Sequence, residues 1–180
     1  MTLSVAPRPR TGASRDQGSC PSSGETPWIQ TGRVRLLVAA TGRWSARIEQ
    51  QLDTPLHEPP LPAMRAPGAQ LLARSRFYQI ESPGNGTAFL YRLPSGRLAL
   101  RLERLRTSPY PDLSVWVSEA RMPRTTEQSA DTPRVRLGRL KSTRGDQNYM
   151  LPANLNRAAV GSVVIWWPRQ HMAYTAATLE

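Results

Sequence analysis

Hydrophobic and polar residues alternate along the C-terminal part of the chain, from about Gln70 onward. The alternating positions include Thr87, Phe89, Tyr91 and Leu93, then Leu98, Leu100 and Leu102, then Leu113, Val115 and Val117. Successive side chains of a β-strand point to opposite faces, so a period of two indicates strands that are half-buried in a sheet. Short turns rich in Gly, Pro and Asn separate these runs, which is typical of β-hairpins.

Further strands are predicted on both sides of these runs. We expect a first strand from Leu71 to Ile80 and a last one from Met172 to Leu179. The continuous apolar run from Val163 to Trp167 predicts a central strand, whereas the arginines of residues 134–140 indicate an edge strand that resists sheet-to-sheet association. A long polar loop is expected over residues 119–133. About eight strands within residues 69–180 predict an all-β domain, an antiparallel β-sandwich.

Residues 1–68 lack the alternation and are rich in proline. Nine of the 17 prolines in the chain precede Gln70. Such a segment buries too little apolar surface to offset its ordering entropy, so we expect a disordered tail that ends in a Pro-rich linker, residues 53–68. Only a short helix near residues 45–52 is expected. The N-terminus shows no clear signal peptide, and the apolar run Val34 to Ala40 lies too far from Met1 unless the natural start is near Arg33.

The net charge of +11 comes mostly from arginine, since Lys141 is the only lysine. One interpretation is an anionic partner, such as nucleic acid, a membrane surface or an acidic protein. The alternative is codon usage in a GC-rich genome, which favours arginine over lysine. Because the arginines are scattered and form no stripe, we favour codon usage and expect no specific nucleic-acid binding. The sequence has no run of about 20 apolar residues, so no transmembrane span is predicted.

The reactive residue types do not assemble into a catalytic or metal site. Cys20, in the tail, is the only cysteine, and His57 and His171 are the only histidines. A nucleophilic triad would need His171 and a serine in a sharp elbow, which the sequence lacks. Zinc requires three or four ligands, and the acidic residues are too dispersed for calcium or for a hydrolytic carboxylate pair. We therefore expect no enzyme and no metal site.

Haem is the one cofactor that the sequence leaves open. His171 and Met172 are adjacent, and Met122 and Met150 are further ligand candidates. Neighbouring residues of a strand point to opposite faces, however, so one of the pair belongs to the core, where methionine usually serves packing. Trp166 and Trp167 must likewise face opposite ways. One fills the interior, and the other lies on the outer face, covered by the N-terminal segment or forming a binding platform.

Four ordered segments resemble one family. They are the hairpin Gly86 to Thr107, PDLSVWVS from Pro111 to Ser118, LGRLKSTRGDQNYMLP from Leu137 to Pro152, and SVVIWW from Ser162 to Trp167. Together they resemble the DM-thirteen domain family, described as an electron-transfer module and related to the DOMON fold. The resemblance covers about residues 70–179 and implies a β-sandwich. It also implies motif positions at Asp112, Lys141, Gly145, Asn148 and Tyr149. These residues either have a role in function or serve only to stabilise turns and strand ends.

The family places a redox cysteine directly after a strand tryptophan that Trp166 matches. Here that position is Trp167, which cannot act as a thiolate. We therefore expect a non-catalytic binding or interaction module whose partner is an unknown protein or an envelope component. The resemblance implies a location outside the bacterial cytoplasm. The candidate functional surface is Trp166, Trp167, Tyr149, Asn148 and Asp112. The alternative is an electron-transfer protein that uses a bound cofactor or a partner protein.

Overall fold

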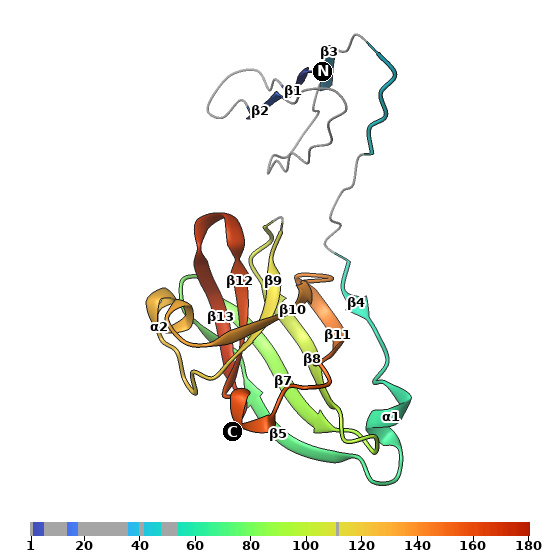
Figure 1. Cartoon of the computed structure of the whole chain (residues 1–180), viewed down its shortest axis with the longest axis vertical. Coiled ribbons are helices and arrows are strands. Elements are labelled where there is room, and N and C mark those ends of the chain that lie inside the picture. Colours follow the sequence, from blue (N-terminus) through green and yellow to red (C-terminus); the bar gives the residue numbers. More distant parts are fainter. Residues whose placement is uncertain (1, 6–13, 18–35, 40–41, 48–53, 111) are drawn as a thin grey trace. The chain divides into compact units, whose positions relative to one another are not determined.

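The computed structural model describes residues 2–5, 14–17, 36–39, 42–47, 54–110 and 112–180 (Figure 1). The chain divides into two units, Met1–Gln50 and Gln51–Glu180. In the first unit, the short strands β1 (Thr2–Val5), β2 (Ser14–Gln17) and β3 (Leu36–Ala39) pair antiparallel in the order β2-β1-β3. Residues 42–47 have no regular structure, and they include the described part of the helix expected near residues 45–52. The remaining residues of the predicted tail before the Pro-rich linker lie outside the described residues.

The second unit is a sandwich of two five-stranded sheets, which confirms the predicted fold class. One sheet has the order β4-β11-β8-β7-β5 and the other the order β10-β9-β12-β13-β6. The strands of the first sheet are β4 (Leu56–His57), β5 (Gln70–Arg76), β7 (Gly84–Arg92), β8 (Leu98–Thr107) and β11 (Arg144–Met150). Those of the second are β6 (Tyr78–Gln79), β9 (Ser114–Ser118), β10 (Arg134–Arg139), β12 (Ser162–Trp167) and β13 (Met172–Thr178). All pairs are antiparallel except β4 with β11.

The core lies between the sheets and contains the inward-facing residues of both. Leu100 and Leu102 of β8 face Val115 and Val117 of β9 and Ile165 of β12 in one apolar cluster, all fully buried. As predicted, β12 is central and β10 is an edge strand. In β7, the core receives Ala88 and Leu90, while Phe89 and Tyr91 lie on the outer face. Both sets are apolar, so the period of two could not tell which face is inside.

The predicted first strand is two strands that belong to different sheets. β5 ends at Arg76 and β6 begins at Tyr78, and the buried Phe77 between them donates its backbone N–H to Gly86 O (3.1 Å). The strands β4 and β6 have two residues each, too few to produce a visible alternation. They raise the number of strands in the described part of this unit from the expected eight to ten.

The outer face of the second sheet is covered from within the unit. Within the predicted loop 119–133, residues Thr126–Ala130 form the short helix α2, whose first turn is capped by the Thr125 side chain accepting from Gln128 N (3.2 Å). Figure 1 shows α2 beside β13. Two one-turn 3-10 helices, η1 (Arg157–Ala159) and η2 (Pro168–Gln170), flank β12. Among the described residues, no helix combines the length and apolar character that crossing a membrane would require.

The Pro-rich linker is ordered from Thr54 onward, which corrects the prediction for this part of it. β4 adds to the edge of β11, and the short helix α1 (Pro62–Arg65) follows it (Figure 1). α1 buries Met64 against Leu93 and Ala99 on the outer face of the first sheet. Proline suits both positions, because it begins a helix well and is tolerated in an extended edge segment. The prolines therefore mark an extended strap, residues 54–60, rather than a spacer.

Candidate functional site

Polar side chains gather on the outer face of the first sheet, where β8, β11 and β4 lie side by side. Strand register places Asn148 of β11 opposite Arg101 of β8. Glu103 follows Arg101 by two residues and Asp146 precedes Asn148 by two residues, so both share this outer face. A fifth polar residue, Glu58, follows directly after β4. The sheet thus brings together residues that are widely separated in the sequence.

Arg101 is the centre of this cluster, and its side chain is only 4% exposed. Its Nε donates to Glu103 Oε1 (2.7 Å), and its Nη1 donates to Asn148 Oδ1 (3.0 Å) and to the backbone oxygen of Glu58 (3.0 Å). Its Nη2 lies 3.5 Å from Asp146 Oδ2. A buried guanidinium requires such partners on several sides, because an unpaired buried charge is very costly.

The Glu58 carboxylate is held by donors from β11 and the turn before it. Lys141 Nζ donates to Oε1 (2.8 Å) and Oε2 (3.0 Å), and Asn148 donates to Oε2 from its backbone N–H (2.8 Å) and from Nδ2 (3.3 Å). Partial burial tends to raise the pKa of Glu58, but the hydrogen bonds from Lys141 and Asn148 and the lysine charge outweigh it and lower the pKa below its ordinary value of 4.5. The carboxylate is therefore ionised at neutral pH.

The backbone of the strap is also bound. Glu58 N–H donates to Asp146 O (3.1 Å), and Asn148 Nδ2 donates to Pro59 O (2.8 Å). Gly145 makes this approach possible, because a Cβ there would lie 2.0 Å from Leu56 O. Its φ of +103° also favours glycine.

Tyr149 lies on the inner side of β11, beneath the cluster. Its hydroxyl donates to Gln147 Oε1 (2.7 Å), lies 3.2 Å from the carbonyl oxygen of Arg139, and accepts from Lys141 N–H (3.2 Å). Burial raises the pKa of Tyr149, so the phenol stays protonated at neutral pH. The Lys141 ammonium also lies 5.2 Å from the centre of the Tyr149 ring, a cation–π contact.

Asp112, in the turn before β9, also joins this network. Its carboxylate pairs with Arg139 of β10 (Nη2 to Oδ1, 2.8 Å) and with Arg169 of η2 (Nε to Oδ2, 3.1 Å). Its φ of +64° is in the left-handed region, which Asp tolerates better than most residues. Through Arg139 and Lys141, three of the five predicted surface residues, Asp112, Tyr149 and Asn148, belong to one connected network.

The two tryptophans lie on opposite faces of β12, as predicted. Trp167 packs against the main core, with ring centroids 4.5 Å from Tyr110 and 5.9 Å from Tyr174. Its buried Nε1 has no hydrogen-bond partner among the residues that the structure describes. Burial, with a smaller contribution from Tyr110, raises the pKa of Tyr174 to about 12. Trp167 is thus a component of an aromatic cluster, Tyr110–Trp167–Tyr174.

Trp166 is covered on the outer face and is only 3% exposed. It packs with Trp116 (6.4 Å between ring centroids) and lies under the Arg134 guanidinium (5.1 Å). Among the described residues, the cover comes from Ala130 of α2 and from Tyr78 and Ile80. Trp166 therefore offers no open binding platform.

The haem candidates lie in different settings. His171 is exposed at the left-handed end of η2, whereas Met172 packs against the core. Met122 (53% exposed) and Met150 (37% exposed) are on the surface. Among the described residues, no group of three or more His, Cys, Asp or Glu gathers as a metal site would need. Cys20 lies outside the described residues.

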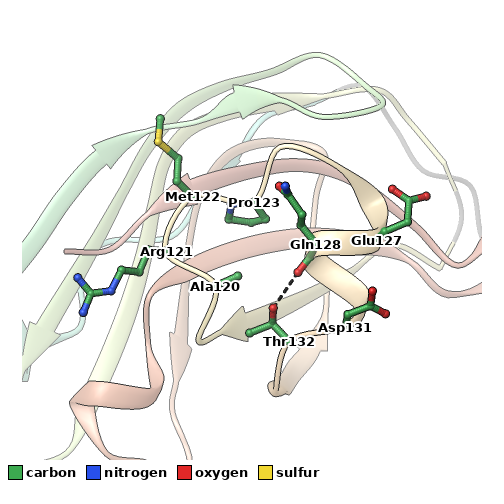
Figure 2. A pocket seen from close by; sticks show the side chains of 8 residues that line it. All are labelled: Ala120, Arg121, Met122, Pro123, Glu127, Gln128, Asp131 and Thr132. Carbon is green, nitrogen blue, oxygen red and sulfur yellow. Dashed lines mark hydrogen bonds between the residues drawn. The ribbon is translucent and has the colours of Figure 1, made fainter.

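A shallow pocket of about 480 Å³ lies around α2, on the loop between β9 and β10 (Figure 2). Its lining consists of Ala120, Arg121, Met122, Pro123, Glu127, Gln128, Asp131 and Thr132. The Thr132 hydroxyl donates to Gln128 O (2.9 Å), which ties the end of α2 to the loop. Of the four haem-ligand candidates, Met122 lines this pocket. The polar network of Arg101, Glu58 and Asn148 lies in another part of the domain.

Comparison with known protein families matches the part of the chain that contains the aromatic cluster and most of the polar cluster. Residues 76–179 match the family described as Electron transfer DM13. The chain belongs to this family. The DM13 match includes Arg101, Lys141, Asn148 and Trp167, but it begins after the strap that carries Glu58. No curated protein and no solved structure matches the chain.

Glu58 and Arg101 belong to the polar cluster but were not identified as site residues from the sequence. Glu58 lies 83 residues before Lys141 and is flanked by prolines, which suggested a linker. Arg101 interrupts a leucine-rich strand, and Glu103 follows on the same face. That i, i+2 spacing of opposite charges within a strand was the available signal, because it predicts a pair on one face.

Proposed function

We propose that this chain is a non-catalytic binding or interaction module of the DM13 type, working outside the bacterial cytoplasm. The observation that carries the proposal is the packing of Trp167 between Tyr110 and Tyr174, at ring-centroid distances of 4.5 and 5.9 Å. The family resemblance puts a redox cysteine at this position. An indole supplies neither a thiolate nor a disulfide partner, so cysteine chemistry has no group to act on here.

The ionisable groups of the polar cluster support the same proposal. Glu58, Glu103 and Asp146 each contact a cation, and the lowered pKa of Glu58 makes it a poor general acid near neutral pH. Tyr149 has a raised pKa and a hydroxyl engaged in hydrogen bonds. Such a cluster suits binding and positioning better than proton transfer.

The location rests on the family resemblance and on cysteine usage. Residues 54–180 contain no cysteine, so the domain needs no reducing compartment to keep thiols free. Fractionation of the natural host, followed by protease treatment of intact cells, tests this directly. Recovery of the protein only in the cytoplasmic fraction would refute the location.

An absorption spectrum combined with mass spectrometry, on protein purified from its native source, tests the function. We expect absorption from Tyr and Trp only, and a mass equal to that of the polypeptide. A Soret or flavin band would contradict a module without a cofactor. The same mass would reveal the natural N-terminus.

The second candidate function is electron transfer through a bound cofactor or a partner protein. It is favoured by membership of a family described as electron transfer and by the aromatic cluster Tyr110–Trp167–Tyr174. It predicts a chromophore whose absorption changes on addition of dithionite. An anionic partner is a weaker alternative. It predicts salt-sensitive retention on heparin, and elution at low salt would refute it.

A further inference from the structure

The edge of β11 has the features of a receptor for a peptide carboxylate. Three donors converge on the Glu58 carboxylate, namely Lys141 Nζ and the backbone N–H and Nδ2 of Asn148, at 2.8–3.3 Å. Lys141 is the only lysine of the chain. Charge-assisted hydrogen bonds of this kind distinguish a carboxylate from a neutral amide of the same shape.

The same edge recognises backbone on either side of that carboxylate. Asp146 O accepts from the amide of Glu58, Arg101 Nη1 donates to the Glu58 carbonyl, and Asn148 Nδ2 donates to the carbonyl of Pro59. Gly145 provides the space that the Leu56 backbone fills. Free acetate or phosphate would use only the carboxylate donors, whereas an extended peptide uses all of these groups.

The present occupant is held by few apolar contacts. β4 pairs with β11 through only two residues, Leu56 and His57. Leu56 is only half-buried, and Pro55, His57 and Pro59 are exposed. A competing segment with the same polar groups would therefore displace little buried apolar surface.

We propose that the β11 edge is a binding site for an extended acidic peptide segment of a partner protein, and that the strap, residues 54–60, is its resident occupant. Binding is by strand addition, in which backbone hydrogen bonds give affinity and the Glu pocket gives selectivity. The strap precedes the DM13 match at residues 76–179, whereas the donors Arg101, Lys141 and Asn148 lie within it. This inference rests on the proposed binding function and names its site and ligand class.

Fluorescence anisotropy with the full-length chain tests the proposal. The probe is a fluorescein-labelled peptide, TPLHEPPL, which copies the strap, and its control is TPLHQPPL. The protein variants are wild type, Glu58→Ala, and Glu58→Ala combined with Lys141→Met. We expect Glu58→Ala to bind the Glu peptide saturably and about tenfold more tightly than wild type does, because the resident carboxylate no longer competes. It should also prefer the Glu peptide over the Gln peptide about tenfold, and Lys141→Met should abolish that preference.

Equal binding of the two peptides by Glu58→Ala, or no binding while its near-UV circular dichroism stays native, would overturn the proposal. If Glu58→Ala does not fold, the isosteric Glu58→Gln variant gives the same comparison. These outcomes are separate from the test of the proposed function. A chromophore band overturns the function, whereas absent peptide binding overturns only the assignment of this site.

Discussion

Replacement of Arg101 by methionine removes the centre of the polar cluster while retaining a side chain of comparable length. Four groups lose a partner: Asn148 Oδ1, which belongs to a residue 7% exposed, the backbone oxygen of Glu58, and the carboxylates of Glu103 and Asp146, 33% and 24% exposed. An unsatisfied buried acceptor costs about 1–3 kcal/mol, and each partly hydrated ion pair contributes up to about 1 kcal/mol. We therefore expect the free energy of unfolding to fall by about 3 kcal/mol, with a decrease in Tm of roughly 10 °C.

Urea unfolding of the full chain at neutral pH, followed by tryptophan fluorescence, measures this loss. Arg106→Met is the matched control, because Arg106 is an exposed arginine on the same strand, β8. That control should change the free energy by no more than about 0.5 kcal/mol. A loss below about 1 kcal/mol for Arg101→Met would refute the reasoning, since it would mean that the cost of desolvating the guanidinium cancels its bonds.

Three further expectations concern single groups. Gly84→Ala should cost about 1–3 kcal/mol in urea unfolding, because its Cβ would lie 1.8 Å from Thr175 Oγ1; an unchanged midpoint would contradict the packing. The pKa of Glu58 is lowered on folding, so its stabilising effect is present above the ordinary value of 4.5 and is lost as the pH falls through the lowered pKa. The difference in midpoint between wild type and Glu58→Gln should therefore shrink as the pH falls below about 4.5. The raised pKa values of Tyr149 and Tyr174 (about 12 for Tyr174) mean that stability is lost as the pH rises above 10, and spectrophotometric titration should show these phenols ionising later in the folded than in the urea-unfolded chain.

The strands could be predicted because a half-buried β-strand requires a local alternation of apolar and polar residues. Leu100 and Leu102, or Val115 and Val117, are buried together on one face, and polar neighbours or tight turns surround them. The pattern failed where both faces are covered or where a strand is very short. In β7 the outward-facing Phe89 is as apolar as the inward-facing Leu90, so the alternation does not show which face is buried. β6 has too few residues to show a period.

The candidate site could be predicted only in part, because it depends on strand register and on contacts between distant residues. The family resemblance gave Lys141 and Asn148, but no local feature connects them with Glu58 or Arg101. Trp166 looked like a surface candidate because nothing in its own strand predicts that α2 covers it. Charge and composition report the net effect of the arginines. They do not show which arginine lies buried among carboxylates, as Arg101 does.

The corner at Phe77 determines which side of the sandwich is joined more tightly. There the chain passes from the margin of one sheet to the margin of the other through a single buried residue, whereas four residues, 140–143, connect β10 to β11 on the opposite side. Local opening of the sandwich on heating should therefore begin at β10 and the strap, while the two sheets stay packed together at the Phe77 corner. Amide hydrogens near that corner should then exchange with solvent more slowly than those of β10.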